Sequence, residues 1–249
     1  MKNKTFGIDS YNYLLDLIIK SNRAIINFNE AHKGLEGIII RHDVDFSPDK
    51  AHSIALVENK KNINSTFFFL VNTELYDIKS SVNINFIKNI LLMGHKIGLH
   101  FDPGKNNLDM SIVEQLCEKQ IAVLENLIDI KIDIISFHRP ENRFIGMNNK
   151  LNNKLHTYMP QFITNINYCS DSGGVWKYDD PEELINNKNI KSVQLLTHPI
   201  WWTTPDDLSP GEKIAFHLKS ASDNIHLAAA INCLPYKTYL QKKGNLEYE

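Results

Sequence analysis

The sequence predicts an α/β protein built on a parallel β-sheet with helices on both of its faces. Short apolar runs alternate with amphipathic stretches along the chain, which is typical of repeated strand–helix units. The apolar runs are continuous, as expected of strands that are buried on both faces. The 249 residues, of which 43% are hydrophobic and 22% charged, suffice for one large globular domain. We therefore expect a single domain over 1–249.

The N-terminal part of the chain contains a helix and the first two strands. Residues 9–21 are expected to form a helix, because capping residues precede apolar side chains at helical spacing. The run Gly-Ile-Ile-Ile at 37–40 predicts a buried strand. A helix follows, since Ser47 and Pro48 suit its N-cap and first position. The run Thr-Phe-Phe-Phe-Leu-Val at 66–71 is too apolar for a half-exposed strand and predicts a second buried one.

The middle of the chain continues the alternation. A helix is expected over 84–91 and is closed by Gly94, and a third strand is expected over 96–99. Apolar residues at a spacing near 3.6 predict a long helix over 111–128. The run 132–137 is the fourth predicted strand.

The last third of the chain is less regular. The Asn-rich stretch 142–167 favours loops and short strands over a separate domain. Residues 193–197 predict another buried strand, and 211–240 predict a helical tail.

Polar side chains follow four of the predicted strands directly. They are Arg41, His42, Asp43 and Asp45 after the first strand, His100 and Asp102 after the third, His138 and Arg139 after the fourth, and His198 after the last. Because functional residues of parallel α/β folds gather at the carboxyl ends of the strands, these side chains are expected to form one site. The sequence therefore predicts a metal or acid–base centre.

The pair Asp43 and Asp45 fits such a centre. Residues i and i+2 of an extended segment face the same side, and carboxylates held that close repel each other unless a cation or a proton lies between them. Histidine and aspartate together suit Zn²⁺ or a related divalent ion. We expect Asp45 and His100 as the first two ligands, with either His138 or Asp102 as the third.

Two further segments could contribute to the site. His198 could act as a general acid, because imidazole both holds and gives a proton near neutral pH. Trp201 and Trp202 could form a wall that stacks on a sugar, or they could be core residues at the rim. In the glycine-rich segment at 170–176, Asp171 could form an ion pair with Arg139 or belong to a simple turn.

The other histidines lack an acidic strand-end context. We expect no site role for His32, His52, His95, His156, His217 and His226, while His42 stays undecided.

Composition excludes several classes of function. With 27 Lys and Arg against 29 Asp and Glu, the net charge of −2 does not suit nucleic-acid binding. Three cysteines without paired spacing exclude a disulfide framework and a thiolate zinc site. No apolar window is long enough for a membrane span. The first residues carry charges where a secretory signal would be apolar, so we expect a cytoplasmic protein.

The strand-end residues, taken in chain order, resemble the polysaccharide deacetylases of the NodB-homology family, especially their divergent relatives from sugar or O-antigen loci. The resemblance covers about 36–202. It consists of Arg-His-Asp-Val-Asp at 41–45 with Ser-Thr-Phe-Phe-Phe at 65–69, Gly-His-Lys-Ile-Gly-Leu-His at 94–100, Phe-His-Arg-Pro at 137–140, Ser-Asp-Ser-Gly-Gly-Val-Trp at 170–176, and Leu-Thr-His at 196–198.

This resemblance implies a distorted (β/α) barrel, usually of seven parallel strands, and metal-dependent hydrolysis of an N-acyl group on a sugar. It implies Asp43 as the general base, Asp45 and His100 as metal ligands, and His198 as the catalytic histidine.

The resemblance also makes Arg139 the active-site arginine. Steadied by Asp171, Arg139 is expected to keep Asp43 ionised and oriented. Substrate contacts are expected from Asp102, Trp176, Trp201 and Trp202.

The sequence departs from the family pattern at two places. Typical members carry a second metal-binding histidine four residues after the first, where this chain has Gly104. The first motif also has an extra residue between its two acids. The third ligand is therefore expected to be His138 or Asp102.

The expected function is removal of an acetyl or formyl group from a sugar by a hydrolase that uses a divalent ion, with Zn²⁺ preferred. The substrate would be linked to a nucleotide, a lipid or a glycan, and the setting would be surface polysaccharide biosynthesis. One alternative is a degenerate deacetylase-like domain that binds a glycan or a partner without catalysis. Another is an Asp-x-Asp glycosyltransferase or phosphatase, for which the histidines would be dispensable.

Overall fold

The computed structural model describes residues 5–243 of the chain. The chain divides into two compact units, Met1–Asp206 and Asp207–Glu249. Within the described range, none of the helices combines the length and the apolar character needed to cross a membrane.

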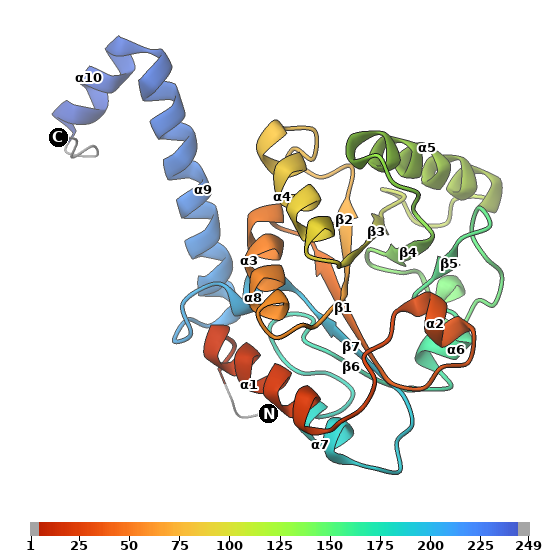
Figure 1. Cartoon of the computed structure of the whole chain (residues 1–249). Helices are drawn as coiled ribbons and strands as arrows, with labels where there is room; N and C mark the ends of the chain where they lie inside the picture. Colours follow the sequence, from red (N-terminus) through yellow and green to blue (C-terminus); the bar gives the residue numbers. More distant parts are fainter. Residues whose placement is uncertain (1–4, 244–249) are drawn as a thin grey trace. The chain divides into compact units, whose positions relative to one another are not determined.

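The first unit is built on one sheet of seven strands. They are β1 (Ile38–Val44), β2 (Thr66–Leu70), β3 (Lys96–Phe101), β4 (Ile134–Phe137), β5 (Leu155–His156), β6 (Asn167–Ser170) and β7 (Val193–Thr197). Their order is β5-β4-β3-β2-β1-β7-β6, and every pairing is parallel. The sheet curls, with helices around it, into a distorted (β/α) barrel (Figure 1). The predicted fold class and the seven parallel strands are confirmed.

Helices cover the sheet and close one end of the curl. They are α1 (Ile8–Lys20), α2 (Phe28–His32), α3 (Pro48–Asn59), α4 (Ser81–Leu92), α5 (Met110–Ile128), α6 (Pro160–Ile163), α7 (Pro181–Asn186) and α8 (Pro199–Trp202), with one 3-10 turn at Asn142–Phe144. The predicted N-terminal helix is confirmed. Ser47 is the N-cap residue of α3, although its side chain makes no capping hydrogen bond, and Pro48 is the first helical residue.

The second unit consists of two helices, α9 (Pro210–Asn232) and α10 (Leu234–Lys242). Ser209 and Glu212 form a capping box at the start of α9, in which each side chain bonds to the other residue's backbone N–H. The sequence predicts a helical tail over 211–240, and these two helices confirm it.

The burial of the central strands explains their apolar sequence. All seven residues of β1 are buried, and Phe67, Phe68 and Phe69 of β2 have no exposed surface. Gly98 of the neighbouring strand β3 makes room for one of these rings, because a Cβ atom there would lie 2.4 Å from Phe68. The expectation that both faces of the sheet are covered is therefore met.

The two faces of β1 carry different groups. On the inner face of the curl, Ile39 belongs to a buried apolar cluster with Phe28, Phe68 and Phe162. Alternation along the strand then places Arg41 and Asp43 above that cluster.

The outer face of β1 carries His42, which the sequence leaves undecided. His42 Nε2 lies 3.0 Å from the buried carboxylate of Glu58, and His42 Nδ1 lies 2.6 Å from Thr197 Oγ1. Glu58 also accepts hydrogen bonds from Tyr11 and Ser65. This network joins α1, α3, β2 and β7 to the back of β1, so His42 belongs to the scaffold.

Candidate active site

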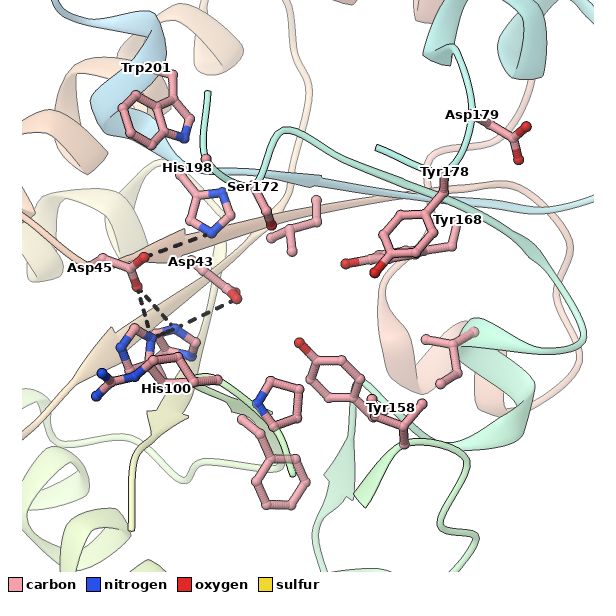
Figure 2. Close-up of a pocket in the computed structure, with 18 of the residues that line it drawn as sticks. Asp43, Asp45, His100, Tyr158, Tyr168, Ser172, Tyr178, Asp179, His198 and Trp201 are labelled. Carbon is pink, nitrogen blue, oxygen red and sulfur yellow. Dashed lines mark hydrogen bonds and ion pairs between the residues drawn. The ribbon is translucent and has the colours of Figure 1, made fainter. Parts of the chain in front are cut away.

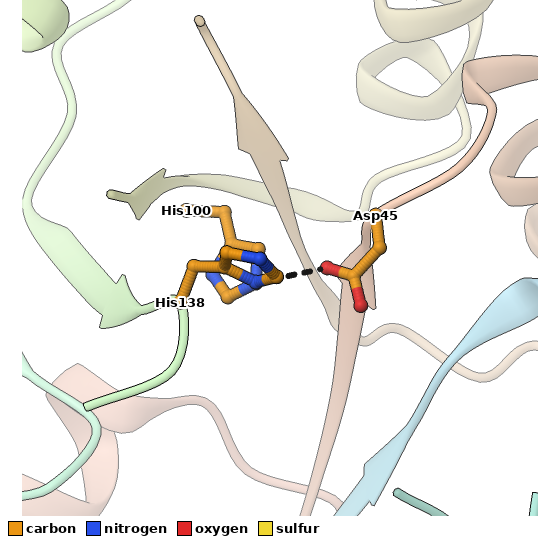
Figure 3. Close-up of side chains that lie close together, drawn as sticks. All are labelled: Asp45, His100 and His138. Carbon is orange, nitrogen blue, oxygen red and sulfur yellow. Dashed lines mark hydrogen bonds and ion pairs between the residues drawn. The ribbon is translucent and has the colours of Figure 1, made fainter. Parts of the chain in front are cut away.

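Three potential metal ligands converge at the carboxyl ends of the strands. Asp45 follows β1, His100 lies in β3 and His138 follows β4; one side-chain N or O atom from each lies within 4.8 Å of the others. Asp45 Oδ1 is 3.1 Å from His100 Nε2 and 3.4 Å from His138 Nδ1 (Figure 3). The strand register creates this arrangement, since Phe101 pairs with Phe137 and brings His100 and His138 to adjacent strands.

The donor set fits a divalent cation. Asp45 Oδ1 is buried and makes no hydrogen bond to any described residue. His100 Nδ1 lies 3.1 Å from the Ser136 carbonyl oxygen. Because a carbonyl only accepts, that ring nitrogen carries the hydrogen, and in the neutral ring the lone pair of His100 Nε2 then faces Asp45 Oδ1 and His138 Nδ1, each 3.1 Å away. An unpaired buried carboxylate oxygen beside an imidazole lone pair is a cation site of the Zn²⁺ type.

The electrostatics of Asp45 agree with such a site. Burial opposes ionisation of Asp45, but when the facing nitrogens of His100 and His138 carry protons instead of binding a cation, their hydrogen bonds and charge outweigh it and hold the pKa of this carboxyl well below its ordinary value. Asp45 is thus a carboxylate at any physiological pH.

Of the two sequence-based choices for a third ligand, only His138 lies in the cluster. Asp102 Oδ2 is 4.0 Å from His138 Nε2, and it instead accepts a hydrogen bond from Arg139 at 2.8 Å. Asp102 lines a smaller neighbouring pocket of about 230 Å³ with Arg139.

Asp43 lies beside the cluster and is bound by a buried arginine. Arg41 Nε donates to Asp43 Oδ1 at 2.9 Å and Arg41 Nη2 donates to Asp43 Oδ2 at 2.7 Å, while Arg41 has no exposed surface. Two parallel charge-assisted bonds fix the carboxylate in orientation as well as charge. Burial opposes ionisation of Asp43, but the Arg41 charge outweighs it and lowers the carboxyl pKa. The second Asp43 oxygen lies 3.7 Å from His100 Nε2.

This geometry corrects the expected role of Arg139. Its side chain is 77% exposed and forms an ion pair with Asp102, whereas Asp171 binds His198. The expected Arg139–Asp171 pair is therefore absent, and Arg41 is the residue that orients Asp43. A sequence signal existed, because Arg41 and Asp43 are two apart on a strand and so share a face.

His198 is held by Asp171 on the opposite side of the cluster. His198 Nδ1 donates to Asp171 Oδ1 at 2.5 Å, and the other oxygen accepts from the His198 backbone N–H at 2.9 Å. The indole of Trp202 donates to the same oxygen at 2.7 Å. His198 Nε2, the free ring nitrogen, lies 3.8 Å from Asp45 Oδ2. Burial lowers the pKa of His198, but the Asp171 charge outweighs it and raises that pKa to about 9.

Replacing Asp171 tests this coupling. In chelator-treated Asp171→Asn, the pKa of His198 should fall from about 9 towards the ordinary 6.5. Because the folded pKa exceeds the unfolded one, charged His198 stabilises the native protein below about pH 6.5, and this stabilisation is lost as pH rises through about 9. NMR titration of the His198 ring protons measures the shift, with Asp179→Asn as the control. An unchanged titration in Asp171→Asn would contradict the assignment.

A pocket of about 670 Å³ opens over these groups, and Asp43, Asp45, His100, His138 and His198 line one end of it (Figure 2). Of the tryptophans expected to contact substrate, Trp201 lines the pocket. Its indole Nε1 is buried and has no hydrogen-bond partner among the described residues.

The other two tryptophans do not line the pocket. Trp202 is 1% exposed, and Trp176 packs against Trp202 with ring centroids 5.8 Å apart. Trp202 is therefore a core residue and Trp176 a half-buried residue that packs on it, and neither is placed to contact a ligand in this pocket. The six histidines for which no site role is expected also lie outside the pocket lining, among the residues that the structure describes.

Three tyrosines at the other end of the pocket were not anticipated. Tyr158 comes from the Asn-rich stretch, Tyr168 from the short strand β6, and Tyr178 from the loop after β6. These segments carry no periodic pattern, so nothing in the sequence indicates that their side chains meet.

Comparison with known proteins adds distant structural neighbours. No family model matches the chain, and no curated protein matches it. Among solved structures, IcaB from Ammonifex degensii is 17% identical with a TM-score of 0.41; the match covers 52% of this chain and 65% of IcaB.

Three further structures match over a larger share of the chain. A family 4 acetyl xylan esterase from Clostridium thermocellum, in complex with a cobalt ion, is 14% identical with a TM-score of 0.40, over 74% of this chain and 84% of that one. A mutant of the peptidoglycan deacetylase PdaC from Bacillus subtilis is 13% identical with a TM-score of 0.47, over 75% and 85%. A wild-type CE4 family pseudoenzyme from Bacillus anthracis also matches, at 13% identity and a TM-score of 0.42, over 81% and 65%. Similarities this low assign no family, so the function is inferred from the site.

Proposed function

We propose that the protein is a metal-dependent hydrolase that removes an N-acyl group, acetyl or formyl, from a sugar. The observation that carries the proposal is that a candidate cation site, a carboxylate and an imidazole converge on one pocket. A cation site of Asp45, His100 and His138 lies between a carboxylate kept ionised, Asp43, and an imidazole with a raised pKa, His198. These three suit amide hydrolysis, because a base can take a proton from water, an acid can give one to the amine, and a cation would polarise the carbonyl.

The chain's own residues supply the proton transfers. Asp43, held by Arg41, accepts a proton from the attacking water. His198, charged at neutral pH and oriented by Asp171, gives a proton to the departing amine nitrogen. A divalent ion, with Zn²⁺ preferred, would act as a Lewis acid on the acyl carbonyl and the water.

Arg139 and Asp102 lie at the rim and do not contact Asp43 or His198. We assign the Arg139–Asp102 pair to holding the loop after β4 at the pocket edge. The resemblance to sugar-locus deacetylases favours the biosynthesis of a surface polysaccharide as the setting, with the deacylation taking place in the cytoplasm.

The geometry disfavours the Asp-x-Asp alternative. A glycosyltransferase or phosphatase of that type would use both carboxylates at the ion, but Asp43 is bound on both oxygens by Arg41. Only Asp45 has an unpaired oxygen. A binding module without metal is the remaining rival.

Metal content separates the hydrolase from the binding module. The wild-type chain should bind one Zn²⁺, while His100→Ala and His138→Ala should each weaken binding at least about tenfold, because each removes one of three ligands. His32→Ala is the matched control, since His32 is exposed and lies outside the pocket. Elemental analysis and release of acetate or formate from N-acylated sugars give the readout. A chain that binds no divalent ion and releases no acid would contradict the proposal.

A further inference from the structure

The pocket has a second end that the proposed chemistry does not use. Asp45, His100 and His198 lie at one end, and Tyr158, Tyr168 and Tyr178 lie at the other (Figure 2). At about 670 Å³ the pocket falls within the range that takes drug-sized ligands, which are larger than one monosaccharide. The tyrosine end therefore offers room for a further part of the substrate.

Tyr178 is held in an unfavourable backbone conformation at the mouth of this end. Its φ is 73°, and the Asp179 N–H donates to the Lys177 carbonyl oxygen at 3.0 Å, which makes Tyr178 the centre of a strained γ-turn. Bulky residues rarely occupy this region, and such strain concentrates at ligand sites. The Tyr178 side chain is nevertheless 74% exposed, so burial in the protein does not repay the strain.

Both sides of the turn are fixed. Lys177 pairs with Ser170 at the end of β6, where the Lys177 N–H donates to the Ser170 carbonyl oxygen at 2.7 Å. Asp180 is buried and caps α7 by accepting from the Glu182 N–H at 2.9 Å. The exposed ring is thus presented by a rigid segment rather than by a free loop.

The other two tyrosines are held in different ways, Tyr168 by its place in strand β6 and Tyr158 by the buried Arg41. The rings of Tyr168 and Tyr178 lie 5.2 Å apart at 47°. Tyr158 lies under the guanidinium of Arg41, 5.1 Å from its ring centre, and its hydroxyl accepts a bond from Arg41 at 3.3 Å. A preformed aromatic wall with one exposed face binds a ligand at low entropic cost.

The charges at this end select against phosphate. Among the described residues that line the pocket, Arg139 is the single lysine or arginine, and it is paired with Asp102. Arg41, behind Tyr158, is fully buried and bound to Asp43. The charged group at the tyrosine end is Asp179, a carboxylate. The two phosphates of a nucleotide or lipid diphosphate would meet no lysine or arginine in the pocket lining at this end, although the exposed Lys177 has its Nζ beside the lining residue Gly173. The C–H face of a neutral sugar, by contrast, packs well on aromatic rings.

We propose that Tyr158, Tyr168 and Tyr178 form a second sugar subsite, which binds the neutral saccharide unit next to the one that is deacylated. This inference rests on the proposed function and narrows its substrate to a glycan of at least two sugar units.

Binding by chelator-treated protein tests the subsite without turnover. The probes are N-acetylglucosamine, N-acetylgalactosamine, disaccharides that contain either unit, and UDP-N-acetylglucosamine, with calorimetry as the readout. The best disaccharide should bind about tenfold more tightly than its monosaccharide, and Tyr178→Ala should remove this difference while leaving monosaccharide binding unchanged. Tyr178→Phe should retain the difference. Tyr239→Ala is the control, because Tyr239 is 53% exposed and lies in α10 outside the pocket lining.

Three outcomes would overturn the subsite. The first is that no disaccharide binds more tightly than its monosaccharide, and the second is that Tyr178→Ala weakens monosaccharide and disaccharide binding equally. The third is that UDP-N-acetylglucosamine binds most tightly of all probes and that Tyr178→Ala weakens this binding. Hydrolysis assays separate the two proposals. A disaccharide preference without acyl release would contradict the proposed hydrolase activity but support the second sugar subsite. Acyl release without a disaccharide preference would support the hydrolase activity but contradict the subsite.

Discussion

Asp43→Asn is expected to lower kcat/KM for acyl release on the order of 10²- to 10⁴-fold, the usual contribution of a general base. An amide cannot take the proton from water, although it keeps the size of the carboxylate and one acceptor for Arg41. The metal should stay bound, since Asp43 lies outside the cluster of Asp45, His100 and His138. Steady-state release of acetate or formate measures the loss, and elemental analysis measures the ion.

The same variant should also unfold at a lower temperature. Asp43 neutralises a guanidinium with no exposed surface, so its loss leaves a buried charge without an ionic partner. Activity is therefore compared at a temperature where circular dichroism shows the variant folded. Asp49→Asn, on the exposed side of α3, is the control. Full activity in folded Asp43→Asn would remove Asp43 from the mechanism.

The strands at the centre of the fold are predictable from sequence, because their continuous apolar residues indicate burial on both faces of the sheet. The Ile run of β1 and the Phe run of β2 have no polar interruption, and both strands are buried throughout. The edge strand β5 is different: it has two residues, Leu155 and His156, and its place depends on pairing with β4. No local pattern marks a strand that tertiary pairing creates.

The candidate site also has a part that the sequence predicts and a part that it does not. Asp45, His100 and His138 each directly follow or end a strong strand, so the parallel sheet alone brings them together. Side-chain partners depend on orientation instead. For this reason the expected partner of Asp43 was Arg139, although the strand alternation favours Arg41.

The orientation of side chains in the loops and short helices around the pocket cannot be predicted from sequence patterns. Trp201 and Trp202 are adjacent, yet the short helix α8 turns one into the pocket and the other into the core. The tyrosine wall depends on a turn at Tyr178 that no propensity would assign to that residue.

Arg41→Met should destabilise the protein by about 3–5 kcal/mol, because it leaves the Asp43 carboxylate buried without its partner. The hydrogen-bonding groups around Arg41, among them Gln194 and Tyr158, lose a partner as well. Urea denaturation of the variant measures the change in the free energy of unfolding.

The double variant Arg41→Met/Asp43→Leu separates the ion pair from general packing. Removing both charges removes the unpaired charge that each single variant leaves, so the double variant should lose less stability than the sum for Arg41→Met and Asp43→Leu. Lys191→Met with Glu36→Leu is the matched control, because that pair joins two exposed side chains at 3.0 Å and should show little coupling. Additive losses at Arg41 and Asp43 would mean that the arginine stabilises the barrel through packing alone, and Asp43 would then need another source for its depressed pKa.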